Sequence, residues 1–257
     1  MIVFQTLRTA RIQLEMRELI ARDAIYLCQL PPEQNERGTT ELIRRIVEPA
    51  AELRSGQVAD PRLWSVQERA FVVAHYLAHI AGGDFPIGES AKYSNYVGEI
   101  APPPAPVSLG HVGGRDWMLQ PLLGWHAEAI ERLVVAEELS ADLGGWMVGA
   151  MAAQVFDASE GPLAGVENTD VVIDAQIAER ATALTGLPES EFAELVSLYR
   201  MRQGEVDHVF RLAFTDDGIA FLPEKEVPGV PPARFQFPAA VREDTKDLFG
   251  TSSRAAN

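Results

Sequence analysis

Apolar residues near the start of the chain change from the spacing of a strand to the spacing of a helix. Three of them, Ile12, Leu14 and Met16, alternate with polar residues, which predicts a half-buried strand. Apolar side chains then recur at helical intervals from residue 20 to residue 28, and Pro31-Pro32 stops this pattern. A short helix is therefore expected directly after the strand.

A second helix is expected after the polar stretch EQNERGTT at residues 33–40. Thr39 or Thr40 can act as its N-cap, because a hydroxyl oxygen accepts a hydrogen bond from a backbone N–H of the first turn. Its apolar positions precede Pro49 and are Leu42, Ile43, Ile46 and Val47. EQNERGTT is accordingly interpreted as a polar bridge between the two helices.

The clearest helix of the chain begins at Ser65. Ser65 and Glu68 have the spacing of a capping box, in which each side chain bonds the backbone N–H of the other residue. The apolar stripe of this helix has intervals of four and three and consists of Val66, Ala70, Val73, Leu77 and Ile80. Gly82-Gly83 is expected to end it.

A proline-rich segment, residues 101–107, is the best candidate for a domain boundary. Prolines at this density favour an extended, stiff spacer. We therefore predict an α+β fold of two small helix-rich lobes, residues 1–100 and 108–222, each with a short strand or hairpin element. Residues 223–257 are predicted to form an extended C-terminal arm, because prolines between 223 and 238 oppose both helix and central strand.

The second lobe begins with a predicted strand at residues 116–121 and a helix that carries four apolar residues on one face, Trp125, Ala129, Leu133 and Ala136. The segment 143–156 is almost wholly small or apolar. It fits a buried helix whose glycines permit close backbone approach, and it also fits an exposed segment covered by a neighbouring subunit.

Two short segments of the chain match loosely, LEMREL at 14–19 and MLQPLL at 118–123. Either an internal duplication or coincidence explains the match.

Two more helices and a hairpin complete the predicted elements. Thr169 can cap a helix that closes at Gly186, with its apolar stripe at Ile173, Ile177, Ala181 and Leu184. Pro188 suits the first turn of the next helix, whose stripe is Phe192, Leu195, Val196 and Tyr199 and whose stop is Gly204. Residues 206–222 alternate around the turn TDDG and predict a β-hairpin.

The first hundred residues resemble a known family. The strand, short helix, PPEQNERG-like break and second helix, followed by DPRLWS at 60–65 and VQERAFVVAHYL at 66–77, are similar to the tail assembly chaperone and baseplate-hub proteins of tailed bacteriophages. The similarity is greatest to a tail protein of Mu-like phages with long flexible tails. It implies partners among other tail or baseplate subunits, oligomeric copies of the chain itself, and a location in the virion tail after assembly in the host cytoplasm.

Composition narrows the range of functions. A chain of 257 residues with 47% hydrophobic and 23% charged residues can bury a substantial core. The formal net charge of −15 argues against nucleic-acid binding, which depends on Lys and Arg. No signal-peptide pattern or run long enough to span a bilayer is evident, and the single Cys28 fits folding in a reducing compartment. We expect no membrane insertion.

Candidate catalytic groups are sparse. His75 and His79 lie four apart on a predicted helix and could share a metal, with Asp84 or His111 recruited by folding, but the third ligand is missing at a useful spacing. The glycines of GHVGGRD at 110–116 lack phosphate-loop spacing and are expected to form a turn. Asp216 and Asp217 are expected at a hairpin tip. We predict no metal, no cofactor and no enzyme activity.

Three functions remain in competition. The first is a structural protein of the tail tip or baseplate, the second is a tail assembly chaperone absent from the finished particle, and the third is a small enzyme, metal-dependent or not. The second half and its arm favour the first, since a minimal chaperone has no use for them. The candidate subunit-contact residues are Phe235, Phe237, Leu248, Phe249, Trp146 and Met147.

Overall fold

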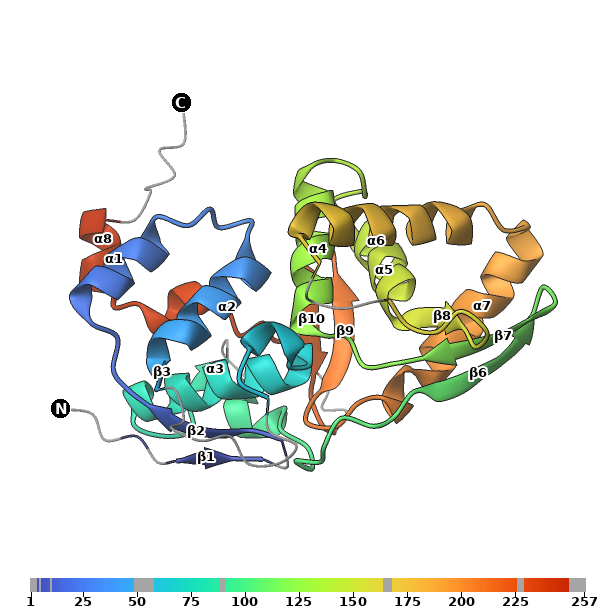
Figure 1. Cartoon of the computed structure of the whole chain (residues 1–257). Coiled ribbons are helices and arrows are strands. Elements are labelled where there is room, and N and C mark those ends of the chain that lie inside the picture. Colours follow the sequence, from blue (N-terminus) through green and yellow to red (C-terminus); the bar gives the residue numbers. More distant parts are fainter. Residues whose placement is uncertain are drawn as a thin grey trace.

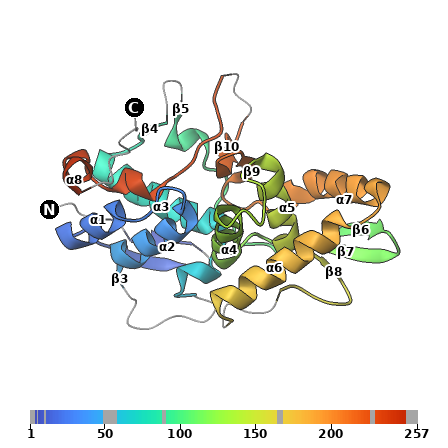
Figure 2. The ribbon, with the colours of Figure 1, turned by 90° about the horizontal axis from the view of Figure 1, so that it is seen from above.

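The α+β prediction is confirmed by a computed structural model that describes residues 4, 6–9, 11–48, 58–87, 91–163, 168–225 and 229–249. Helices dominate this part of the chain, and small antiparallel sheets flank them (Figure 1). Viewed from above, α1, α2, α3 and α8 gather on one side, and α4 to α7 with β6 to β10 gather on the other (Figure 2).

The N-terminal side follows the predicted order of strand and helices. Its sheet is antiparallel in the order β1-β2-β3, and its strands are β1 (Leu7–Arg8), β2 (Gln13–Met16) and β3 (Val47–Glu48). Its helices are α1 (Ala21–Cys28), α2 (Asn35–Ile46) and α3 (Val66–Ala81), with a 3-10 turn, η1 (Pro61–Leu63), before α3. A small ribbon of β4 (Pro86–Ile87) and β5 (Ala91–Lys92) and the turn η2 (Tyr93–Asn95) follow.

Helix α3 lies at the centre of this side, and its predicted ends are confirmed. The Ser65 hydroxyl accepts a hydrogen bond from Glu68 N–H at 3.0 Å, and the Glu68 carboxylate accepts one from Ser65 N–H at 2.9 Å. Gly82 ends the helix in the left-handed conformation, with φ at 79°, which a side chain would oppose. Nearly every residue of the first three turns is buried.

The second side combines two sheets with four helices. Strands β6 (Val107–Val112), β7 (Arg115–Leu119) and β8 (Val155–Asp157) form one antiparallel sheet, and β9 (Arg211–Thr215) pairs with β10 (Gly218–Leu222). The helices are α4 (Gly124–Val135), α5 (Leu143–Gln154), α6 (Asp170–Thr185) and α7 (Glu189–Arg202), the last followed by the turn η3 (Gln203–Glu205). The predicted glycine turn is confirmed, because Gly113 and Gly114 join β6 to β7 with positive φ.

Three predicted boundaries on this side need correction. Val107, assigned to the linker, begins β6, although residues 101–106 do form the extended connection expected of them. The apolar helix stops at Gln154, because the next three residues pair with β7. The hairpin prediction is confirmed, but its first strand begins only at Arg211, since the residues before it bond to α3.

The start of α2 also differs from the prediction. Residues 33–40 were interpreted as a polar bridge capped at Thr39 or Thr40, yet the helix begins at Asn35 and both threonines are buried inside it. The backbone N–H groups of Glu36 and Arg37 donate hydrogen bonds to the carboxyl oxygens of Glu131 of α4, at 2.7 and 3.1 Å. The side chain of a distant helix therefore replaces the local cap.

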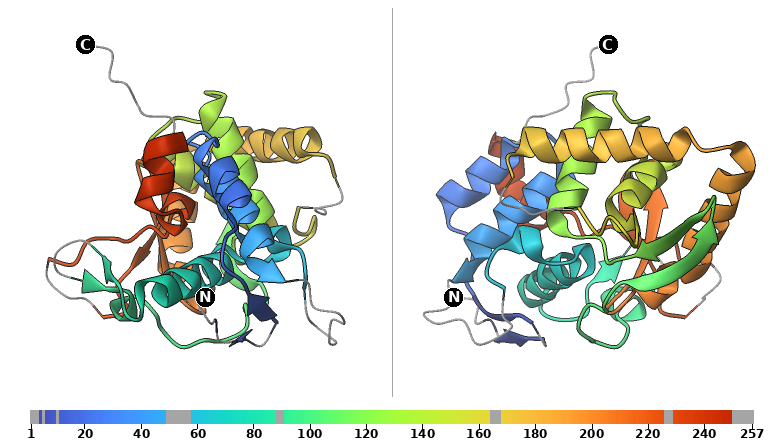
Figure 3. Two further views of the ribbon diagram at one scale, coloured as in Figure 1. Left: turned by 90° about the vertical axis from the view of Figure 1, so that its left-hand side faces the viewer. Right: turned by 45° about the vertical axis from the view of Figure 1, so that its right-hand side comes forward.

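The expected extended arm is wrong for the part of it that the structure describes after residue 228. Ala233 pairs with Phe221 as an isolated bridge, the turn η4 (Phe237–Ala240) packs against α2 and α3, and α8 (Glu243–Phe249) packs against α1 (Figure 3). Phe235 and Phe237 are only 6% and 2% exposed. A Cβ on Gly38 would overlap the Phe237 ring, so this glycine permits the contact. Residues 250–257 lie outside the described residues.

The predicted division into two lobes stays a prediction. Each sheet among the described residues draws its strands from one side of the proline-rich linker only. Contacts nevertheless cross that boundary, because α2 packs on α4 and Ser65 pairs with Leu123. A single hydrophobic cluster extends through both sides.

Candidate protein-binding groove

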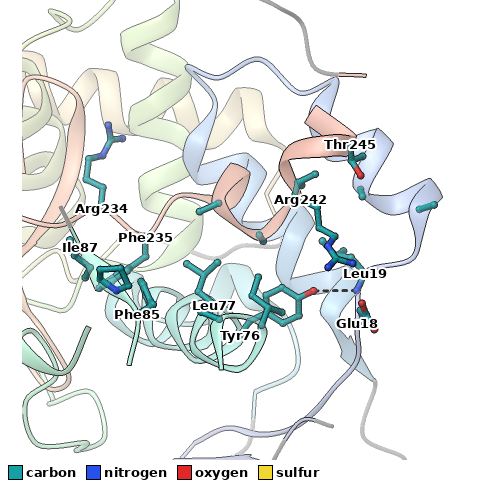
Figure 4. A pocket seen from close by; sticks show the side chains of 18 residues that line it. Glu18, Leu19, Tyr76, Leu77, Phe85, Ile87, Arg234, Phe235, Arg242 and Thr245 are labelled. Atoms are coloured by element: carbon teal, nitrogen blue, oxygen red, sulfur yellow. Dashed lines mark hydrogen bonds between the residues drawn. The ribbon is translucent and has the colours of Figure 1, made fainter. Parts of the chain in front are cut away.

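A groove of about 740 Å³ lies between α1, α3 and the C-terminal segment that contains η4 and α8 (Figure 4). Its lining is mainly apolar, and its apolar members include Leu19, Ala24, Leu77, Ile80, Phe85, Ile87, Phe235 and Val241. Three separate stretches of chain supply these side chains, which the fold brings together only because η4 lies on α2 and α3. A concave surface of this size and composition is suited to binding an apolar part of another molecule.

Tyr76 marks the middle of the groove and is held firmly. Its hydroxyl oxygen accepts a hydrogen bond from Leu19 N–H at 3.2 Å, and Phe4 stacks on its ring with centroids 5.2 Å apart. Burial raises the pKa of the Tyr76 hydroxyl above its ordinary value, so the group stays protonated at neutral pH. The wall that Tyr76 forms is accordingly uncharged.

One end of the groove is built from packed aromatic rings. Phe85 stacks on Tyr93 at 5.4 Å, and the edge of Phe235 meets both rings at 6.4 and 6.0 Å. Phe235 also contacts Phe210 and Phe221 from the hairpin side. Because Phe235 is fixed on several sides, this end of the groove is preformed.

Charged side chains stand at the two ends of the apolar lining. Arg234 lies at the end formed by Phe85 and Phe235, and Arg242 lies with Glu18 at the end formed by α1 (Figure 4). The Arg234 guanidinium Nε donates a hydrogen bond to the Ile219 carbonyl at 3.3 Å, which orients it. The charged residues of the groove lining are thus these two arginines and Glu18, and the adjacent helix α8 adds Glu243, Asp244, Lys246 and Asp247 outside the lining.

The six predicted contact residues fall into two groups. Phe235, Phe237 and Trp146 are buried within the chain itself, and Met147 is half-buried against the core. This corrects the expectation that the two phenylalanines project from an open arm. Leu248 and Phe249 are 75% and 46% exposed at the end of α8, beside the groove that Thr245 of the same helix helps to line.

Apart from the groove, the structure brings together a serine and a histidine, Ser65 and His208, which the sequence did not indicate. Ser65 Oγ lies 2.8 Å from His208 Nε2, and His208 Nδ1 lies 3.2 Å from the Val206 carbonyl oxygen. A histidine that donates from Nδ1 to Val206 accepts at Nε2 from the serine, which is the geometry of a nucleophile and its base. Ser65 is buried, however, and its oxygen also accepts the α3 capping bond. The pair therefore joins α3 to the segment before β9.

Gln67 and Asp207 extend this junction. Gln67 Oε1 accepts hydrogen bonds from the N–H groups of residues 208–210, and its amide donates to Asp207 at 2.8 Å. Burial raises the pKa of Asp207 to about 7. These contacts bind two segments far apart in sequence. Asp207, which is half-buried, and His208 also line a pocket of about 370 Å³.

Buried carboxylates form a third polar cluster, between α2, α3 and α4. Arg69 is 1% exposed and faces Glu36 Oε2 at 3.7 Å and Glu128 Oε1 at 4.0 Å. It also donates to the Glu36 carbonyl oxygen, and Thr40 donates to Glu128. Burial, reinforced by the nearby Glu36 carboxylate, raises the pKa of Glu131 to about 8. The cluster fastens α2 to α4.

The raised pKa of Glu131 predicts a loss of stability as pH rises from 6.5 to 8. The folded chain keeps this carboxyl protonated while the unfolded chain, with an ordinary pKa near 4.5, has already lost the proton. Each pH unit well below the folded pKa therefore costs up to about 1.4 kcal/mol, and the whole window costs somewhat less than about 2 kcal/mol. Asp207, whose pKa burial raises to about 7, adds a smaller loss of the same sign in the lower part of the window. Buried His126, whose pKa is lowered to about 3, acts in the opposite direction, because the imidazole of the unfolded chain, with an ordinary pKa near 6.5, is still partly protonated at the start of the window. Urea unfolding at several pH values measures the slope.

Glu131→Gln is expected to remove most of that slope, because the amide does not ionise. The matched control is Glu138→Gln, an exposed residue just beyond the same helix, which should keep the wild-type slope. Equal slopes for the wild type and Glu131→Gln would show that Glu131 is ionised throughout the window.

The residues considered for metal binding are not assembled into a site. His75 and His79 lie side by side on α3 with ring centroids 4.4 Å apart, whereas His111 bonds Asp116 on an exposed hairpin and Asp84 bonds Ser94. In the described part of the chain, no group of three His, Cys, Asp or Glu side chains has a metal-binding arrangement. Asp216 accepts a hydrogen bond from Leu143 N–H at the hairpin tip, which is a structural role.

Comparison with known proteins adds no relative: no family model, curated protein or solved structure matches the chain. Among the described helices, none has the length and apolar character required to cross a bilayer. The binding role of the groove is therefore inferred from its geometry alone.

Proposed function

We propose that this chain is a structural protein of a bacteriophage tail, located at the tail tip or baseplate, and that it works by binding other subunits and copies of itself. The resemblance of residues 1–100 to tail proteins of Mu-like phages supports the tail assignment. The observation that carries the mode of action is the apolar groove of about 740 Å³, together with the exposed Leu248 and Phe249 of α8, the helix that contributes Thr245 to the groove lining. Subunit contacts are built from such apolar surfaces with charged rims.

A binding role also agrees with the placement of the polar clusters. The Ser65 and His208 pair and the Arg69 cluster are buried and join segments of the chain to one another. Their contacts stabilise the body that carries the groove. We therefore assign the protein no catalytic reaction, and its proposed location is the virion, reached after assembly in the host cytoplasm.

Mass spectrometry of phage particles purified from a lysate tests this proposal. We expect abundant peptides from this chain in intact particles, at a ratio to the tube protein that is constant from one preparation to the next. A phage protein known to be left behind after assembly, quantified in the same fractions, provides the background. Absence of the chain from particles, with abundance in the lysate, would reject a structural role.

The second candidate is a tail assembly chaperone that does not remain in the virion. The observation that favours it is the position of residues 229–249, which lie on the body of the chain and do not reach outward as a permanent connection to neighbours. The groove would then hold its partner only during assembly. The same particle measurement distinguishes the two candidates.

A further inference from the structure

We propose that the groove binds a second copy of this chain, through the exposed end of the partner's α8, so that two subunits form a symmetric dimer. This inference rests on the proposed binding role of the groove and names its occupant. Three observations support it: the exposed apolar residues of α8, the charges of α8 and of the groove, and the position of α8 at the groove edge.

The apolar side chains of α8 need a partner surface. Leu248 and Phe249 are consecutive, large and exposed, although the rest of the C-terminal segment buries its apolar residues well. Burying each of these side chains in the groove of a second copy would remove apolar surface from water, which favours association. The groove offers the matching surface, because apolar side chains from three segments line it and its aromatic end is preformed.

The charges of the two surfaces are opposite. Helix α8 carries Glu243, Asp244 and Asp247 against one lysine, Lys246, which gives it a net charge of −2. The groove lining has two arginines, Arg234 and Arg242, against one carboxylate, Glu18. Arg234 is held by the Ile219 carbonyl, so Arg242 is the cation that Asp247 of the second copy would meet. Two copies of a chain with −15 repel each other on average, so a local match of this kind is what orients their contact.

The position of α8 makes the contact reciprocal. The helix packs on α1 and contributes Thr245 to the groove, so donor and acceptor surfaces are adjacent on one face. When one copy inserts the end of its α8 into the groove of a second, a two-fold axis brings the second α8 to the groove of the first. An interface of this kind closes on itself and stops at two subunits.

Light scattering coupled to size-exclusion chromatography, and sedimentation equilibrium, test the proposal on the full chain. We expect the wild type to be a dimer at micromolar concentrations. Leu248→Asp and Ala81→Glu, one on each surface, should both give monomers. Ala81 lines the groove and is exposed, so its substitution leaves the core intact. Val171→Asp, at an equally exposed apolar residue on α6, should remain dimeric.

A charge-reversal pair checks that these two surfaces meet each other. Arg242→Glu and Asp247→Arg should each weaken the dimer by roughly tenfold or more, and the double variant should recover most of the loss. Circular dichroism confirms that each variant is folded. A monomeric wild type, a dimer that ignores Leu248→Asp and Ala81→Glu, or a double variant no better than the singles would overturn the proposal. None of these results alters the particle measurement, so the tail assignment is judged separately.

Discussion

Truncation after Leu222 is expected to give a chain that does not fold. The deleted residues include Phe235, Phe237 and Val241, which are buried among α2, α3 and the hairpin. Each such side chain contributes about 1.5–3 kcal/mol by burial, or about 5–9 kcal/mol together. That sum is comparable to the whole stability of an ordinary domain, about 5–15 kcal/mol. Soluble yield and a thermal unfolding curve measure the effect.

Two single substitutions distinguish the loss of buried side chains from the shortening of the chain. Phe237→Ala is expected to cost about 3–5 kcal/mol, because it leaves a cavity beside Gly38. Leu248→Ala, in the same segment but 75% exposed, should change stability by less than about 0.5 kcal/mol. A soluble, cooperatively unfolding fragment ending at Leu222 would mean that the segment contributes little to the fold.

Replacing Arg69 by Met is expected to destabilise the chain by about 3–5 kcal/mol. The arginine is the buried cation that faces Glu36 and Glu128. Its removal leaves the Glu36 carboxylate without an opposite charge in the interior, while Glu128 keeps its ion pair with Arg62. In a chain of this length the loss corresponds to a fall of about 10 °C in Tm. Differential scanning calorimetry at neutral pH measures it.

Arg44→Met is the matched control for that variant. Arg44 makes ion pairs of similar length, with Glu41 and Asp60, but its side chain is 45% exposed, and the expected change is below about 1 kcal/mol. Adding Glu36→Gln to Arg69→Met should recover part of the stability, since it removes the carboxylate that has lost its cation. If Arg69→Met and Arg44→Met had equal effects, burial of the Arg69 cluster would be contradicted.

Elements specified by neighbouring residues were predictable from the sequence. The Ser65 and Glu68 box set the start of α3, and a left-handed glycine set its end, because both devices act within a few residues. The beginning of α2 was mispredicted for the opposite reason. Its cap is Glu131, which no local pattern connects to Glu36, so the threonines inside the helix looked like better caps.

The groove could not be predicted, because its lining comes from segments near residues 20, 80 and 240. In the sequence, Leu77 and Ile80 belong to one apolar stripe, yet Leu77 is buried and Ile80 only partly so. Prolines correctly excluded a central strand among the described residues 223–225 and 229–238, but the absence of regular structure was mistaken for absence of packing. Phe235 and Phe237 pack in irregular and 3-10 backbone, which hydrophobic periodicity does not detect.

Because Glu131 of α4 caps α2, helix α2 can become stable only after the ribosome has made α4. A ribosome releases residues 35–46 well before it has made α4, so the first turn of α2 has no acceptor for its amide groups, and Arg69 lacks one of its carboxylates, Glu128. Domains otherwise tend to fold as their N-terminal parts emerge. In this chain α2 is capped only after α4 has been made, and it is covered only after η4 has been made. The nascent N-terminal half therefore remains exposed to premature association until the ribosome has made residues 237–240.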